Sequence, residues 1–165
     1  MASSSSAVQG SPKTSPAVPT TLPSAVTTFA THPATVIILS GIACVLALRL
    51  QGPALGAWDA LTVAAVAAFW VLQEWAIHKY LLHTTIDWVG SKIHIDHHQQ
   101  PYHHVSIDSP SIVLPFMALA AGVFYVVLDG GKGSGLALTA TAAYYAMGLT
   151  YEWIHFLVHT RYVPR

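Results

Sequence analysis

Four long apolar segments constrain the fold of this chain more than any other feature. They cover residues 34–50, 58–83, 111–128 and 136–159, and even the shortest approaches the length that lets a helix cross a bilayer. Short turns rich in Gly and Pro separate them, except between the second and third segments, where the link is longer and carries many histidines. The sequence therefore predicts an all-α integral membrane bundle of about four transmembrane helices.

Composition supports a membrane protein. The 165 residues have a mean hydropathy of +0.51 and are 53% hydrophobic, which is too apolar for an ordinary soluble domain. Seven basic and seven acidic residues give a formal net charge of zero. Without a basic patch, the sequence gives no reason to expect a nucleic-acid partner.

The first 33 residues differ from the rest of the chain. They are rich in Ser, Thr and Pro and have few large apolar side chains, so they cannot bury enough surface to offset the entropy of ordering. We expect a disordered tail over residues 1–33 and a membrane-embedded domain over residues 34–165. A plastid or mitochondrial signal is the alternative, although such signals are usually rich in Arg and this stretch has only Lys13.

Basic residues are unevenly divided between the two ends of the predicted bundle. The positive-inside rule places the more basic end in the cytosol. We therefore expect a cytosolic histidine-rich face. The membrane that we expect is the endoplasmic reticulum, with a plastid membrane as the alternative. The histidine end has Lys13, Lys79, Lys92, Arg161 and Arg165, whereas Arg49 and Lys132 lie at the other end.

Histidines are concentrated between residues 78 and 104, which hold seven of the ten in the chain. Neutral imidazole is the commonest protein ligand for zinc and iron, so this concentration predicts a multi-histidine metal site. His94, His97 and His98 have the spacing i, i+3 and i+4, which places them on one side of a helix.

Two further histidine pairs flank this group. His155 and His159 are four residues apart and share one helix face. His78 and His83 are five apart, about 140° around an ideal α-helix. The latter pair therefore needs a local π-like turn to bind one ion, or else serves two ions.

Four other polar residues accompany these ligands. Glu74 and Glu152 share helix faces with His78 and His155, and we expect them to orient imidazole N–H groups without binding the metal. His103 and His104 follow Pro101. They either support the site in the same way or belong to a polar loop.

The histidine motifs resemble those of the fatty acid hydroxylase / sterol desaturase superfamily. The similarity covers residues 35–165 and rests on HKYLLH at 78–83, HIDHH at 94–98 and HFLVH at 155–159. It implies a membrane oxygenase with a histidine-ligated di-iron centre, in which zinc could substitute on purification. It also implies O2-dependent hydroxylation or desaturation of a fatty acyl or sterol lipid, with electrons from a b5-type cytochrome or a ferredoxin. The implied metal ligands are His78, His83, His94, His97, His98, His155 and His159.

One part of the family pattern is missing from the sequence. The pattern continues after H-x3-H with a further H-x2-H-H cluster, whereas the sequence stops at Arg165. We therefore expect the domain to be C-terminally incomplete, and a truncated, catalytically inactive metal-binding protein is an alternative. Such a chain could also pair with a full-length partner in a homo- or hetero-oligomer.

Two other functions compete with the oxygenase. A haem-binding helical protein could use His78 and His155 as axial ligands, but this leaves the other histidines unexplained. An intramembrane zinc hydrolase would be expected to carry an H-E-x-x-H motif, which this sequence lacks.

Overall fold

The computed structural model of the chain describes residues 18–99 and 105–163. Within these ranges the protein is helical and has no strand, which confirms the predicted all-α class. Two helices end in a π-helical turn, labelled η. The elements are α1 (Leu22–Thr31), α2 (Pro33–Leu50), α3 (Ala57–Ala76), η1 (Ile77–Leu82), α4 (Val89–Gln99), α5 (Pro110–Phe124), η2 (Tyr125–Asp129) and α6 (Leu136–Val158).

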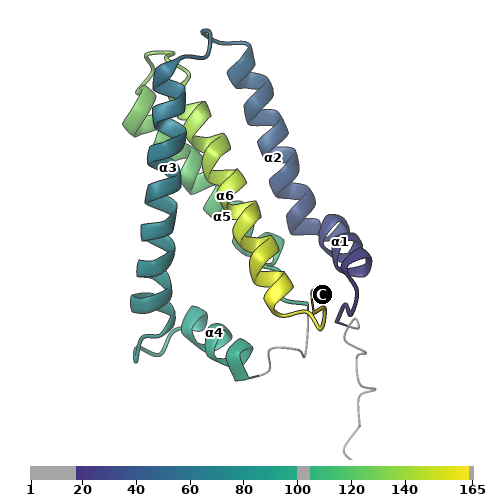
Figure 1. The fold of residues 1–165 in the computed structure, drawn as a ribbon. Helices are drawn as coiled ribbons and strands as arrows, with labels where there is room; N and C mark the ends of the chain where they lie inside the picture. The colour runs from purple at the N-terminus through teal and green to yellow at the C-terminus, as the bar shows by residue number, and fades with distance from the viewer. Residues whose placement is uncertain (1–17, 100–104, 164–165) are drawn as a thin grey trace, which may run out of the picture.

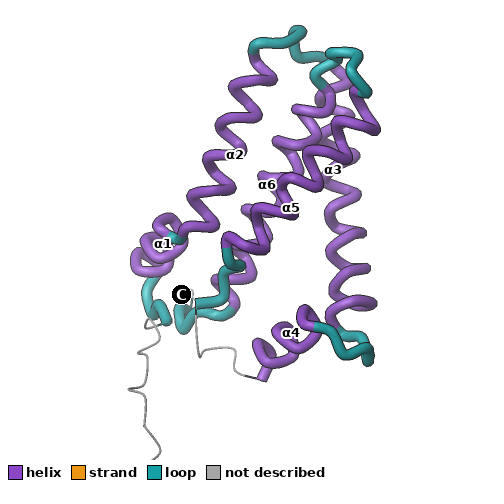
Figure 2. The backbone as a smooth tube through the Cα atoms, turned by 180° about the vertical axis from the view of Figure 1, so that it is seen from behind, coloured by secondary structure: helices purple, strands orange, loops and turns teal. Residues whose placement is uncertain are grey.

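Helix α6 is the central element of the bundle. It packs against α2, α3 and α5, and its last turns also meet α1 (Figure 1). The short helix α4 lies at the same end of the molecule as α1 and the end of α6, as the view from behind also shows (Figure 2). The chain thus has a turn-bearing end, with the α2–α3 and η2–α6 connections, and an opposite end that carries α4.

In the described part of the chain, three helices are long and apolar enough to cross a membrane by length and composition. They are α2, α3 with η1, and α5 with η2. Many of their large apolar side chains point away from the protein, and Leu72 and Val126 are 66% and 72% exposed. Helix α6 is not among these candidate spans, and its polar Thr139, Thr141 and Glu152 side chains are buried in the bundle.

The helix boundaries agree with the four apolar segments of the sequence to within about one residue at each start. Pro33 and Pro110 occupy the first turns of α2 and α5, where a missing backbone N–H costs nothing. Tyr145 of α6 joins α2 and α5 in one buried cluster with Ala34, Ile38 and Val113.

The predicted disordered tail is wrong for residues 22–31, which form α1; residues 1–17 lie outside the described part of the chain. Thr21 and Ser24 form a capping box at the start of α1. Phe29 is buried against Phe156 and Trp153, with ring centroids 5.8 and 5.0 Å away. Its partners lie more than a hundred residues further along the sequence, so local composition could not reveal this burial.

A buried ion pair joins three helices at the turn-bearing end. Arg49 of α2 donates from Nε and Nη2 to Asp59 Oδ1 of α3, at 3.0 and 2.8 Å. Arg49 Nε also donates to Thr139 Oγ1 of α6 at 2.9 Å, and the Thr139 hydroxyl donates to the same Asp59 oxygen. Gly135 adopts φ +77°, and a Cβ there would lie 3.1 Å from Arg49 Nε.

Candidate metal centre

The π-helical turn η1 brings the first histidine pair together. A π-helix pairs residues five apart, and the His83 backbone N–H donates to His78 O at 3.2 Å. The two Nε2 atoms therefore lie 3.1 Å apart, on the same side of the turn. This confirms the first of the two predicted arrangements, the local π-like turn.

Helix α4 supplies the next two imidazoles. His94 and His98 are one turn apart with their Nε2 atoms 3.0 Å from each other, and His94 Nε2 lies 3.2 Å from His83 Nε2. Two hydrogen bonds hold the intervening turn: Trp88 Nε1 donates to Leu81 O at 2.9 Å, and Ser91 Oγ donates to Thr84 O at 3.5 Å. The turn thereby directs α4 back toward η1.

The four imidazoles converge on one point. The potential ligand atoms of His78, His83, His94 and His98 all lie within 4.8 Å of one another. With metal–nitrogen bonds of about 2.05 Å, neighbouring ligands would be about 3.3 Å apart in a tetrahedral site and about 2.9 Å apart at right angles. The three measured spacings of 3.0–3.2 Å fall between these values.

Hydrogen bonding among the rings does not account for this arrangement as well as a cation does. His83 Nε2 faces both His78 Nε2 and His94 Nε2, but a neutral imidazole nitrogen carries at most one proton. A metal ion would accept the lone pairs of all four nitrogens together. The donor set therefore fits zinc or iron.

His94 also has the protonation state that a metal ligand needs. Burial, with a smaller contribution from the neighbouring imidazoles, lowers the pKa of His94 to about 4. Because this pKa lies well below 7, the ring is neutral at physiological pH and keeps a lone pair for a metal.

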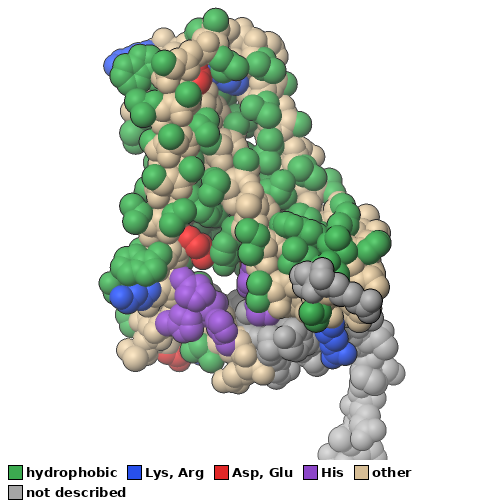
Figure 3. Space-filling model, viewed as in Figure 1, with side chains coloured by type: hydrophobic (Ala, Val, Ile, Leu, Met, Phe, Trp, Pro, Cys, Tyr) green, Lys and Arg blue, Asp and Glu red, His purple; other side chains and the backbone are tan. Residues whose placement is uncertain are grey.

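His155 and His159 form a second pair at the end of α6. Their ring centroids are 4.9 Å apart, and the Tyr151 ring lies 5.5 Å from that of His155. Neither residue belongs to the four-histidine cluster. Figure 3 shows the histidine side chains in two places at this end of the molecule, a large group and a smaller one set farther back.

The remaining predicted residues have varied positions. Glu74 is half-buried on α3, and Glu152 is buried on α6, where its Oε2 accepts the Asp108 backbone N–H at 3.2 Å. The described contacts do not test whether either one orients an imidazole. His97 lies on α4, but its side chain, together with His103 and His104, falls outside the described part of the structure.

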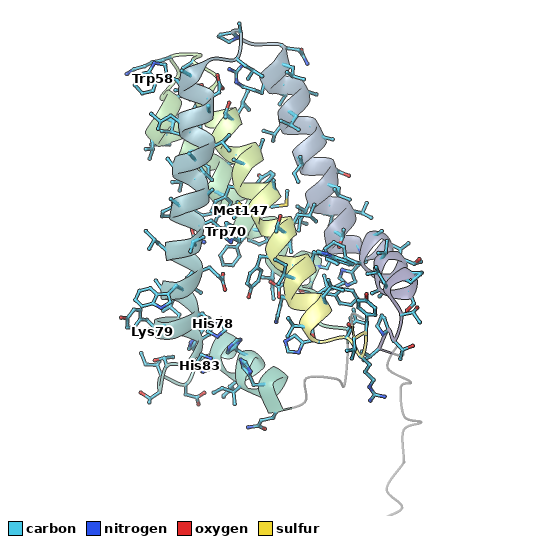
Figure 4. The ribbon with its side chains drawn as sticks, in the orientation of Figure 1. Trp58, Trp70, His78, Lys79, His83 and Met147 are labelled. Carbon is cyan, nitrogen blue, oxygen red and sulfur yellow. The ribbon has the colours of Figure 1, made fainter. Side chains whose placement is uncertain are left out.

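A cavity of about 700 Å³ opens between α3 and α6 next to the cluster. Trp70, Val71 and Trp75 line it on α3, and Met147 and Ile154 face them from α6. His78 and His83 lie at its histidine end, with Trp70 and Met147 farther along (Figure 4). Its size falls in the usual range for small-molecule sites.

The sequence led us to expect an apolar tunnel between helices but not the residues that line it, although their spacing is visible in the sequence. Trp70, Glu74 and His78 follow one another at four-residue intervals and share a face of the continuous helix that α3 and η1 form. Met147 and Tyr151 repeat the interval on α6. The sequence alone does not show that these two faces oppose each other.

Comparison of the chain with protein-family models, curated proteins and solved structures found no match. The function is therefore inferred from the residues and geometry of the site.

Proposed function

We propose that this protein is a membrane-bound, O2-dependent lipid hydroxylase or desaturase with a histidine-ligated di-iron centre. The observation that carries the proposal is the convergence of four imidazoles at one end of an apolar cavity, between a candidate membrane-spanning helix and the central helix. An oxidising metal and an apolar chain would meet at this place.

The described histidines divide into two ligand sets. His78, His83, His94 and His98 would hold one iron ion. His155 and His159 would contribute to a second, with His97 as a further ligand. Glu74 and Glu152 would orient imidazole rings from behind. Bound iron would supply the activation of O2.

The protein's own residues would bind and position the substrate. The apolar lining of the cavity would hold an acyl chain or sterol and exclude water from the reacting carbon. Trp70 and Met147, on opposite walls of the cavity, would fix how deeply the substrate enters. Because α3 borders the cavity and is itself a candidate span, the substrate could enter sideways from the bilayer.

The membrane arrangement belongs to the same proposal. Helix α6 would be the fourth span, with its polar side chains protected by its neighbours. Lys79, Lys92 and Arg161 favour a cytosolic histidine end in the endoplasmic reticulum, and a plastid membrane is the alternative. A b5-type cytochrome or ferredoxin would deliver electrons at that end, and the chain could act as a homo- or hetero-oligomer.

Reconstitution tests the activity. The iron-loaded protein in lipid nanodiscs, given O2 and a reduced donor, should convert acyl or sterol lipids to products heavier by one oxygen or lighter by two hydrogens, as measured by mass spectrometry. The His83→Ala variant should form no product. Equal product from both proteins, or none from the iron-loaded wild type with either donor, would contradict the proposal.

A metal-binding protein without oxygenase activity is the second candidate. The four clustered nitrogens could complete a tetrahedral site for a single zinc ion, since the three spacings of 3.0–3.2 Å along the series lie close to that geometry. This candidate predicts one zinc per chain and no lipid oxidation.

A further inference from the structure

Lys79 is a cation held at the rim of the α3–α6 cavity. Its Nζ lies 4.9 Å from the centroid of the Trp75 ring and 5.2 Å from that of Tyr80. The two rings pack edge to face, with centroids 5.6 Å apart. Two aromatic faces therefore hold the ammonium group beside the cavity that Lys79 and Trp75 help to line.

Within the described part of the chain, no carboxylate forms an ion pair with this ammonium group. Among the described residues, Lys92 pairs with Asp87 at 2.9 Å and Arg49 pairs with Asp59 at 2.8 Å, whereas Lys79 forms no ion pair. Cation–π contacts supply partial negative charge without saturating the three N–H donors of a lysine. Lys79 therefore remains able to bind an anion.

The position of Lys79 indicates which class of ligand would carry that anion. Lys79 lies at the same end of α3 as His78 and His83 (Figure 4). The surface of the adjoining cavity is mostly apolar, with Trp70 and Val71 on its α3 wall, although Glu74 also lines it, and its volume of about 700 Å³ falls in the range of sites for one small ligand. A ligand that matches both features has a single apolar chain and an anionic head group.

We propose that Lys79 is the head-group-recognising residue of this cavity, and that its ligand is a single-chain acyl lipid with a carboxylate head group. The inference rests on the proposed function for the identity of the site as a lipid site, and it adds the charge that the site selects. The acyl chain of the ligand lies between α3 and α6, and its carboxylate accepts a hydrogen bond from the Lys79 ammonium group at the rim of the cavity.

Binding of brominated fatty acids tests this inference without any reaction. Trp70 and Trp75 line the cavity, so dibromostearic acid should quench their fluorescence as it binds to the protein in zwitterionic nanodiscs at pH 8. The neutral methyl ester is the matched ligand. The wild type should bind the acid about tenfold more tightly than the ester, because a charge-assisted hydrogen bond is lost with the ester.

Three variants isolate the lysine. Lys79→Gln should reduce the preference for the acid to about one, Lys79→Arg should restore most of it, and Lys132→Gln at the other end of the bundle should leave it unchanged. Circular dichroism and metal content, measured on every variant, would show that the fold and the metal site persist.

Two results would overturn the head-group assignment. Equal affinity for acid and ester in the wild type would mean that Lys79 only anchors α3 at the membrane surface. Displacement of the acid by millimolar inorganic phosphate would indicate a general anion site in place of a lipid site. By contrast, protein that retains no metal after gentle purification but still discriminates acid from ester would contradict the proposed oxygenase and support the assignment of Lys79.

Discussion

Polar side chains have different kinds of partner at the two ends of the bundle. At the turn-bearing end, Arg49 is only 3% exposed, but Asp59, Thr139 and the Pro53 carbonyl satisfy its guanidinium group. At the other end, His78, His83, His94 and His98 face one another through like atoms. At one end a carboxylate of the same chain balances the buried cation, whereas at the other end the described cluster consists of imidazoles alone.

This difference separates a structural polar cluster from a functional one. The four clustered histidines lie within residues 78–98, whereas the Arg49 cluster reaches from α2 to Thr139 of α6. Each nitrogen of the Arg49 guanidinium has an acceptor in the same chain. A group of imidazoles with no carboxylate among its members is most simply explained by a metal ion. Substitutions at the two ends should therefore have different consequences.

The largest expected effect is the loss of metal on removal of the α4 ligands. The double variant His94→Ala/His98→Ala leaves two of the four clustered nitrogens, so the ion held by this cluster should be lost and metal content should fall to about half of the wild-type value or lower. Metal analysis of purified protein measures this. His32→Ala, which changes a histidine outside the cluster, is the control, and full metal content in the double variant would exclude α4 from the site.

The ion pair at the opposite end should affect stability without affecting metal. Asp59→Asn leaves the buried Arg49 guanidinium without a compensating charge, so the melting temperature in detergent should fall clearly. Metal content per folded chain should stay at the wild-type value. A loss of metal in this variant at temperatures where it remains folded would show that the two ends are coupled and would contradict their separate roles.

A smaller loss of stability should follow Gly135→Ala. The residue adopts φ +77°, which costs a non-glycine residue about 1–2 kcal/mol, and the new Cβ would press on Arg49. Thermal unfolding should therefore show a lower midpoint. Gly122→Ala is the matched control, since nothing lies within 4 Å of its added Cβ and helix α5 should gain slightly in stability. Equal midpoints for the two variants would refute the close packing of Arg49 on Gly135.

The orientation of the bundle in the membrane can be tested by cysteine labelling, with variants that should not change stability. In a Cys44→Ser background, Lys92→Cys should react with an impermeant maleimide only from the cytosolic side, and Lys132→Cys only from the opposite side. The reversed pattern would place the histidines outside the cytosol.

The sequence predicted the helices well because each apolar segment is punctuated by Pro or Gly, as at Pro33, Pro110 and Gly135. It also predicted the π-like turn as one of two arrangements, since an ideal α-helix would hold His78 and His83 too far apart around its axis to share an ion. It could not predict α1, because Phe29 is buried only through contacts with Trp153 and Phe156. The residues that line the cavity could not be predicted either, since they depend on which face of α6 meets α3.

The metal content of the wild-type protein, measured together with its optical spectrum after gentle purification in detergent, tests the proposed metal centre most directly. We expect about two iron ions per chain, or zinc in their place, and no Soret band. Protein that is folded and retains no metal, or that shows the Soret band of a haem, would contradict the proposed centre.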